Sequence, residues 1–489
     1  MYYLEYFYLK CYYYTEEKRK GVKNMEKYDV LVIGASTTGS WFARKMAEKG
    51  YKVLMIEKED KKNISRAYDI FHMSKKEMDQ FGLEIPEPGS KEFGFTFEGS
   101  PVMSPYGNYA KSCKPATVVG LHKHEYILFM HEKAKQAGAK ISCGAEFTEL
   151  VFDENGKVKG AKYKTSRGEK EVEAKLVADC TGIPSVARRQ MPDSSTVENF
   201  KLTNRDVFFV VLYYVKYLDE KVRARDLDSS YLNYKVWSAP SGEEHGAILG
   251  VGGNYGYDYA ETIYETQFRK NVPWPEYKVE KVEKGLTPYH RGIYSFVDDG
   301  FIAMGDTACL TKPTCGEGCT SSLVQCEIAV NVIDSLLKEG KALTRENMWP
   351  INCEYIKKQG IAFDSMRPLL MGIVSCSPSE AEYLFKKDII FSRKILGNQG
   401  EDLDLSAKDI ADIITGIASG IVTGKIKPAT VGAIAKGLLG MLDVTKLYEQ
   451  YPSTAGGYFE WKEKADALWD RIGSMADKCD KDILNKLGY

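Results

Sequence analysis

The sequence predicts an α/β fold, in which a Rossmann-like domain is interrupted by an antiparallel sheet and followed by a C-terminal helical region. Three observations lead to this prediction. A buried strand, a glycine turn, a helix and a second strand follow one another near the N-terminus, aromatic and β-branched runs fill the middle, and helical periodicity dominates the end. The predicted boundaries are residues 25–195 and 285–337 for the two parts of the Rossmann-like domain, 196–284 for the antiparallel domain and 338–489 for the helical region.

Composition excludes several classes of protein. The 489 residues include 67 Lys and Arg and 68 Asp and Glu, so the net charge is −1 and nucleic acid is not an expected partner. No run of 18 apolar residues suggests a membrane span. The eleven cysteines are odd in number and irregularly spaced, with no signal peptide before them, which favours a reduced, cytoplasmic chain without a metal site.

The first 24 residues do not look like part of the fold. They are rich in Tyr, and Glu5 and Lys10 interrupt the apolar part, which excludes a secretory h-region. Met25 then opens the first strand of the α/β domain. We expect residues 1–24 to be a non-native leader or a disordered extension, with a short interfacial anchor as the alternative.

A dinucleotide-binding unit begins at the first strand. The apolar run Tyr28–Ile33 is followed by the turn Gly34–Gly39, a helix over Ser40–Lys49 and a second strand, Tyr51–Glu57. The turn aims backbone N–H groups and a helix N-terminus at a pyrophosphate, and the acid that ends the second strand suits a ribose. Ser36 replaces the middle glycine of the pattern, and its hydroxyl is a donor for phosphate.

Two further motifs follow in a fixed order. The strand Leu176–Gly182 ends in Asp-Cys-Thr-Gly, and the strand Phe301–Asp306 leads through Lys312–Gly318 into the helical run Thr320–Leu337. Over roughly residues 25–335, this order resembles the FAD enzymes related to p-hydroxybenzoate hydroxylase and, more closely, the geranylgeranyl reductase family.

The resemblance implies FAD as the cofactor and assigns its contacts. Gly34, Ser36 and Gly39 would hold the pyrophosphate, Glu57 the adenosine ribose and Asp306 a ribitol hydroxyl. The other implied cofactor-binding residues are Asp179, Gly182, Gly305, Pro313, Gly316 and Gly318. A helix that starts near Gly318 would point its positive end at the flavin edge that becomes negative on reduction.

A softer match lies at Val118–Ala139, which resembles the family helix that follows a flavin-contacting Arg. His122 or Lys123 occupies that place, and the register between them stays open, with Lys123 taken as the candidate. Together with His124 and His131, His122 raises the question of a metal site, but no carboxylate or Cys spacing supports one. A solvated basic helix face is the favoured interpretation.

The middle of the chain is expected to form an antiparallel substrate domain, with strands at Val207–Tyr217 and Gly246–Val251. Geranylgeranyl reductases carry a Tyr-x-Trp-x-Phe-Pro signature and a Gly-x-Gly there, which this sequence matches in part. The implied substrate-binding residues are Tyr234, Trp237, Pro240, Gly250 and Gly252; an ordinary sheet edge with a buried Trp is the alternative.

The run Gly250–Gly256 also mimics a second dinucleotide loop, but we interpret it as a turn. The electron donor is therefore expected to be transiently docked NAD(P)H or a small ferredoxin-like carrier. Cys315, beside Gly316 in the flavin loop, is the one candidate catalytic residue, since a helix N-terminus stabilises a thiolate. A small loop filler is the alternative.

The C-terminal third is predicted to be helical over 346–356, 379–390, 407–422, 430–451 and 460–487. The segment Ile410–Leu442 is rich in Ile, Ala and Gly. It would line a tunnel for an apolar substrate, lie on a membrane surface, or pack against the Rossmann-like domain or a second subunit.

The expected function is an FAD-dependent oxidoreductase that transfers hydride from reduced flavin to a carbon–carbon double bond of an apolar, possibly isoprenoid, substrate. One alternative is a flavin monooxygenase or halogenase of the same superfamily. Another, from a different class, is a non-catalytic lipid-binding protein on the same fold.

Overall fold

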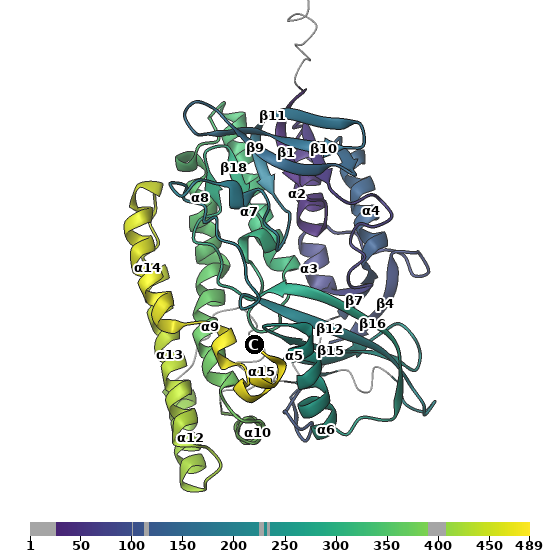
Figure 1. Cartoon of the computed structure of the whole chain (residues 1–489), viewed down its shortest axis with the longest axis vertical. Helices are drawn as coiled ribbons and strands as arrows, with labels where there is room; N and C mark the ends of the chain where they lie inside the picture. The colour runs from purple at the N-terminus through teal and green to yellow at the C-terminus, as the bar shows by residue number, and fades with distance from the viewer. Residues whose placement is uncertain (1–25, 100, 112–116, 224–228, 232–234, 390–406) are drawn as a thin grey trace, which may run out of the picture.

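The computed structural model describes residues 26–99, 101–111, 117–223, 229–231, 235–389 and 407–489 (Figure 1). The predicted leader, residues 1–24, and the candidate Tyr234 lie outside the described residues. Among the described helices, none combines the length and the apolar character that a membrane span requires.

A mostly parallel sheet forms the core of the Rossmann-like domain. Its central strand β1 (Glu26–Ile33) pairs in parallel with β2 (Val53–Glu57) and with β11 (Gly168–Asp179). Residues 30–33 are at most 2% exposed, as expected of a strand buried on both faces. The sheet continues through β8 (Lys140–Cys143) on one side and β18 (Phe301–Ala303) and β17 (Val297–Asp298) on the other, and the hairpin β9 (Glu146–Phe152) and β10 (Val158–Thr165) extends β11.

Helices cover this sheet. The first, α2 (Thr37–Glu48), contacts both α4 (Lys123–Gln136) and α7 (Cys319–Lys338), and α7 in turn contacts α8 (Arg345–Tyr355). Because α2 and α7 lie together, the glycine turn before α2 and the flavin loop before α7 end up side by side.

A second, mainly antiparallel sheet lies below the first in Figure 1. Its strands, in spatial order, are β16 (Tyr277–Pro288), β12 (Val207–Tyr217), β15 (Gly246–Gly253), β14 (Lys235–Pro240), β13 (Ser229–Tyr231), β5 (Val102–Met103) and β6 (Ala110–Lys111). Around it lie α5 (Tyr257–Ile263), the π-helix η3 (Tyr264–Phe268), α6 (Arg269–Asn271) and α15 (Lys481–Leu487).

A small sheet and several short turns complete this part of the molecule. The small sheet has the order β3 (Ile70–Ser74), β7 (Thr117–His122) and β4 (Phe93–Glu98), with α3 (Lys75–Gln80) after β3. The 3₁₀ turns are η1 (Arg188–Gln190), η4 (Gly305–Ala308), η6 (Ala455–Gly457) and η7 (Met475–Lys478).

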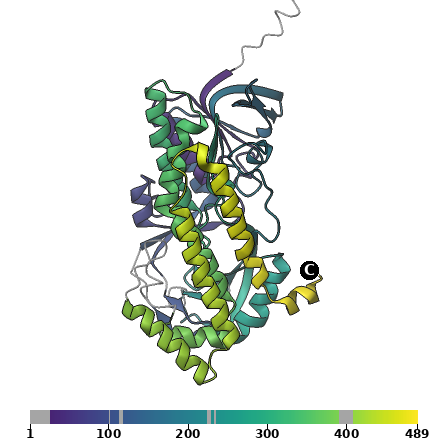
Figure 2. The same ribbon diagram turned by 90° about the vertical axis from the view of Figure 1, so that its left-hand side faces the viewer.

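The C-terminal region is helical, as Figure 2 shows in green and yellow. It contains the π-helix η5 (Ile356–Gly360), α9 (Ile361–Val374), α10 (Pro378–Lys386), α12 (Ala407–Val422), α13 (Pro428–Tyr448) and α14 (Tyr458–Ile472). Helices α9 and α13 pack closely because glycine lies at their crossing: a Cβ on Gly437 would lie 2.7 Å from the Pro368 carbonyl oxygen.

The predicted fold class is confirmed, and three local expectations are corrected. The run Gly250–Gly256 is not a turn, since β15 continues to Gly253 and α5 begins at Tyr257. The helix α9, which carries Pro368 in its interior, was not among the predicted helices. The single helix predicted over residues 460–487 is broken at Gly473, whose φ is +82°.

Candidate cofactor and substrate site

The glycine turn between β1 and α2 is built from close backbone approaches. Gly34 has φ +96°, and a Cβ there would lie 2.4 Å from the Cys180 carbonyl oxygen. A Cβ on Gly39 would lie 2.0 Å from the Gly34 carbonyl oxygen. Ser36 is the N-cap of α2, and its side chain makes no capping hydrogen bond. The first-turn N–H groups of α2 are therefore available to an anion.

Glu57, at the end of β2, steadies this turn. One carboxylate oxygen accepts a hydrogen bond from the Ala35 N–H at 3.0 Å, and the other accepts from the Glu59 N–H at 2.9 Å. The carboxylate is thus fixed beside the glycine turn, where a ribose would follow a bound pyrophosphate.

The histidines of α4 do not form a solvated face, contrary to the sequence interpretation. His131 is 1% exposed and its Nε2 lies 2.7 Å from the Ala35 carbonyl oxygen, while His124 is 8% exposed and bonds the Ile64 carbonyl. Burial lowers the pKa of His131, so the neutral ring braces the glycine turn from behind. Sequence reasoning missed this role because His131 lies 96 residues beyond its partner and carries no local signal.

The second motif closes the loop after β11. The Asp179 side chain is fully buried and accepts hydrogen bonds from the Thr181 N–H and hydroxyl and from the N–H groups of Ala187 and Arg188. All four donors belong to residues 181–188, which follow β11, so Asp179 fixes the shape of this loop. Gly182 has φ +72°, and its carbonyl oxygen accepts from the Thr307 hydroxyl at 3.2 Å, which ties the second motif to the third.

The third motif brings glycine and carboxylate together between α2 and α7. Gly305 has φ +65°, and a Cβ there would lie 2.7 Å from the Thr38 hydroxyl oxygen. A Cβ on Gly318 would lie 2.8 Å from Oδ1 of Asp306. Burial raises the pKa of Asp306, and the nearby Lys123 ammonium opposes the rise.

The loop before α7 is a closed turn. The Lys312 N–H donates to the Glu317 carbonyl oxygen, and the N–H of Gly316, which has φ +74°, donates back to the Lys312 carbonyl oxygen, both at 2.8 Å. The Pro313 carbonyl oxygen accepts from the Tyr289 hydroxyl at 2.5 Å. Tyr289, which directly follows β16 of the antiparallel sheet, therefore fixes the position of this loop.

The candidate Cys315 lies in this loop but not at the helix end. Its side chain is exposed, and α7 begins at Cys319, with Gly318 as the N-cap. The thiol at the first helical position is that of Cys319, and burial raises its pKa to about 12. It therefore stays protonated at neutral pH.

Lys123 is the first residue of α4, directly after β7. Its ammonium donates to the Ala67 carbonyl oxygen at 3.0 Å, and burial lowers its pKa while Cys319, Asp306 and Glu283 oppose the drop. His122 instead turns toward Asp69, with 3.4 Å between Nδ1 and the carboxylate. Of the two residues left open by the sequence, Lys123 is the one whose charge acts on Asp306.

Next to the flavin loop, side chains from several elements form an apolar cluster, which we call the aromatic wall. It comprises Tyr68, Phe95, Phe208, Trp237, Tyr289 and Met371, with further aliphatic residues of β12, β15 and α9. The rings of Phe208 and Tyr289 lie 4.0 Å apart between centroids. Since Tyr289 also bonds Pro313, the wall reaches the flavin loop.

Two of the predicted substrate residues form one packing unit of this wall. Trp237 in β14 pairs with Gly250 in β15, and a Cβ on Gly250 would lie 2.2 Å from Cε2 of the indole. Gly250 is therefore needed so that the indole lies across the sheet. Pro240 pairs with Ala247 at the end of β14, and Gly252 is buried opposite Val210 of β12.

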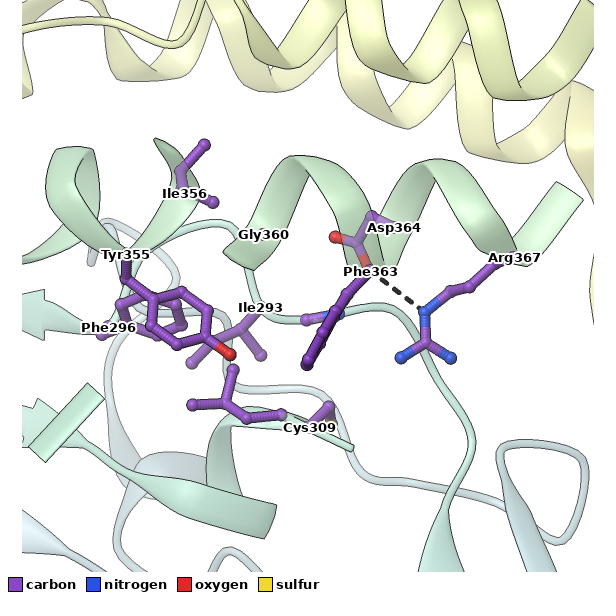
Figure 3. Close-up of a pocket in the computed structure, with 11 residues that line it drawn as sticks. Ile293, Phe296, Cys309, Tyr355, Ile356, Gly360, Phe363, Asp364 and Arg367 are labelled. Carbon is purple, nitrogen blue, oxygen red and sulfur yellow. Dashed lines mark hydrogen bonds and ion pairs between the residues drawn. The ribbon is translucent and has the colours of Figure 1, made fainter. Parts of the chain in front are cut away.

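A small pocket lies between the chain before the flavin loop and the C-terminal helices (Figure 3). It is lined by Ile293, Cys309, Tyr355, Phe363, Asp364 and Arg367, among others. Arg367 pairs with Asp364 at 3.1 Å and donates to the Thr311 carbonyl oxygen at 3.2 Å. This buried pair fastens α9 to the segment that leads into the flavin loop.

The residues present fit a bound FAD. The glycine turn and the third motif are cradles that a Cβ would fill, and α2 offers uncapped N–H groups. Asp306 lies in the third motif, where the charge of Lys123 acts on it. Backbone donors, a positive helix end and a carboxylate for hydroxyl groups form the donor set that a dinucleotide requires.

Comparisons with known proteins agree with this fit. Residues 27–224 match the model of the FAD binding domain family. The chain is 25% identical over 457 residues to digeranylgeranylglycerophospholipid reductase of Sulfolobus acidocaldarius, covering 90% of this chain and 97% of that protein. It is 26% identical to the protein of the same name from Methanocella arvoryzae, covering 65% and 81% of the two chains.

Solved structures share the fold. A geranylgeranyl bacteriochlorophyll reductase-like protein from Thermoplasma acidophilum superposes with a TM-score of 0.63 at 20% identity, over 82% of this chain and all of that one. The flavin-dependent brominase Bmp2 gives 0.55 at 18% identity, over 81% and 100%. The resemblance to geranylgeranyl reductases and the FAD cofactor, both expected from the motifs, are confirmed, and the chain is an FAD-dependent oxidoreductase.

Proposed function

We propose that this FAD-dependent oxidoreductase, which resembles the geranylgeranyl reductases, reduces carbon–carbon double bonds in the isoprenoid chains of a lipid. The observation that carries the proposal is the junction of the aromatic wall with the flavin loop, through the 2.5 Å hydrogen bond from Tyr289 to Pro313. An apolar wall beside a flavin loop suits an uncharged alkene, and relatives named digeranylgeranylglycerophospholipid reductase indicate the substrate class.

The residues divide the work between cofactor and substrate. We assign Gly34, Ser36 and Gly39 to the pyrophosphate, Glu57 to the adenosine ribose and Asp306 to a ribitol hydroxyl. Bound FAD would supply the hydride. The chain binds and orients the cofactor and the substrate, and it excludes water from the site. The N-terminus of α7, which begins at Cys319, would face the flavin edge that becomes negative on reduction, and its positive end would favour the reduced cofactor.

On the substrate side, Trp237, Pro240, Gly250 and Gly252 shape the antiparallel sheet, which would cover the bound flavin. The residues between 196 and 284 are accordingly assigned as the substrate domain. Electrons reach the flavin from transiently docked NAD(P)H or from a ferredoxin-like carrier. A role for Cys315 in tuning the flavin stays a prediction.

A membrane-bound substrate calls for a surface that meets the lipid. The hairpin of α12 and α13 exposes Ile414, Val422 and Leu439 at 62%, 88% and 62%. Between Asp412 and Asp443 the sequence holds Lys425, Lys427 and Lys436 and no carboxylate. We assign this hairpin to peripheral contact with an anionic lipid surface.

Anaerobic photoreduction tests the proposed function. The reduced enzyme is mixed with isoprenoid alkenes, non-isoprenoid alkenes or oxygen, and the return of the oxidised flavin spectrum is followed. We expect fast reoxidation by isoprenoid lipids and slower reoxidation by oxygen. Fast oxygen consumption coupled to a hydroxylated or halogenated product would favour a monooxygenase or halogenase, and a colourless protein that refuses FAD would favour the lipid-binding alternative.

A further inference from the structure

Tyr68 lies in a strained turn between β2 and β3. Its φ is +61°, a left-handed conformation that a large aromatic residue rarely adopts. Such strain persists where the surrounding structure forces it, and it concentrates at functional sites. The turn directs the Tyr68 ring into the aromatic wall, against Gly285 of β16.

The hydroxyl of Tyr68 is buried and has no hydrogen-bond partner. Two other tyrosines of this region are satisfied: Tyr214 donates to Glu283 at 2.9 Å and Tyr289 donates to Pro313. A Cβ on Gly285 would lie 2.2 Å from Cζ of Tyr68 and 2.3 Å from its hydroxyl oxygen. The strand thus carries a glycine where this hydroxyl must fit, although nothing in the described chain bonds it.

Charged groups of the cofactor site surround the ring. The Lys123 ammonium lies 5.4 Å from the ring centre and bonds the carbonyl of Ala67, the residue before Tyr68. Burial raises the pKa of Tyr68, and the negative charge of Asp306 and Glu283 adds to the rise, so the hydroxyl keeps its proton at neutral pH. Tyr68 therefore stands where the flavin site meets the apolar wall.

We propose that the Tyr68 hydroxyl is the proton donor that completes reduction of the double bond. This inference rests on the proposed function. Saturation of an alkene adds two electrons and one proton as hydride, which the reduced cofactor supplies, and one further proton at the other carbon. Tyr68 gives that proton as its O–H bond breaks and the new C–H bond forms. The positive charge of Lys123, 5.4 Å from the ring centre, offsets the charge of the phenolate, which takes a proton back from water.

The Tyr68→Phe variant tests the role because it removes one atom and no ring. Its matched control is Tyr458→Phe, which removes another buried hydroxyl without a partner, in α14. Gly285→Ala is a second variant, since its Cβ displaces the Tyr68 ring while keeping the hydroxyl. Each protein is purified with FAD, photoreduced without oxygen and mixed with the geranylgeranyl lipid in H₂O and in D₂O.

For Tyr68→Phe we expect normal FAD content and lipid affinity but reoxidation slower by about 10²-fold, the usual contribution of a positioned acid. At the carbon that receives the proton, deuterium from D₂O should lie on one face in the wild type and on both faces in the variant. Thermal stability should equal or exceed that of the wild type, because a buried unsatisfied hydroxyl is gone. Gly285→Ala should slow reoxidation in the same way, and Tyr458→Phe should not.

The outcomes separate two failures. A wild-type enzyme that oxygen reoxidises and the lipid does not would overturn the proposed function and, with it, the role of Tyr68. A wild-type enzyme that reduces the lipid, beside a Tyr68→Phe variant with the same rate and the same deuterium stereochemistry, would overturn the role of Tyr68 alone.

Discussion

The nucleotide end and the substrate end of this molecule are built by different means. At the nucleotide end, the determining contacts are between backbones, as at Gly34, Gly39 and Gly305, where a Cβ would overlap a neighbour. At the substrate end they are between side chains, as where Trp237 lies across Gly250 and the Tyr289 ring packs at a tilt against Phe208. A dinucleotide has one shape to be cradled, whereas an apolar chain needs only a surface of suitable extent.

The largest effect is expected from Gly39→Ala. The Cβ would lie 2.0 Å from the Gly34 carbonyl oxygen, and neither group can move without opening the glycine turn. We expect complete loss of bound FAD, read as absorbance near 450 nm relative to 280 nm. The control is Gly432→Ala in α13, where nothing lies within 4 Å of the added Cβ. Retention of FAD by Gly39→Ala would contradict the claim that close backbone contacts determine the nucleotide end.

Gly250→Ala should damage the substrate end alone. Its Cβ meets a rigid indole at 2.2 Å, and overpacking of this kind costs about 1–3 kcal/mol. We expect lower thermal stability and slow reoxidation by lipid, with full FAD occupancy. The double variant with Trp237→Leu should regain most of the stability but not the lipid reaction, since the clash is gone and the aromatic surface with it. Loss of FAD in the single variant would contradict the separation.

A histidine beside the aromatic wall should make stability pH-dependent. The Nε2 of His72 is buried without a partner, its ring contacts Phe95 and Phe97, and burial lowers its pKa to about 4. Because the unfolded chain, with a pKa of about 6.5, binds the proton first as pH falls, stability is full above that value and is lost between about pH 6.5 and 4.

At pH 5 the His72 contribution to this loss is about 2 kcal/mol. His72→Phe should flatten the dependence of the urea unfolding midpoint on pH between 7 and 5. An unchanged slope in the variant would show that other groups carry the dependence.

The smallest effect is expected from Cys315→Ser. The side chain is exposed and precedes the start of α7, so the change should alter lipid reduction by no more than about twofold, as for other surface substitutions. The measurement is the reoxidation rate together with the flavin reduction potential. A tenfold loss or a shifted potential would support the predicted role of Cys315 in tuning the flavin over that of a loop filler.

The difference between backbone and side-chain contacts also explains which parts of the fold and of the site could be predicted from the sequence. Gly34, Gly182 and Asp306 could be singled out from the sequence because backbone approaches demand particular residues at fixed spacing next to a strand. Tyr68 and His131 could not be singled out, because the residues that they contact, Gly285 and Ala35, lie far along the chain. Helix α9 was not predicted; it carries Pro368 in its interior and packs closely against α13.

The most direct test is a single turnover without oxygen. One equivalent of photoreduced enzyme is mixed with digeranylgeranylglycerophospholipid. The number of double bonds saturated, measured by mass spectrometry of the lipid, is compared with the amount of flavin reoxidised. We predict that each reoxidised flavin leaves one lipid double bond saturated, with two hydrogens gained and no oxygen. Flavin that stays reduced in the presence of the lipid, or is reoxidised only when oxygen enters the product, would contradict the proposed function.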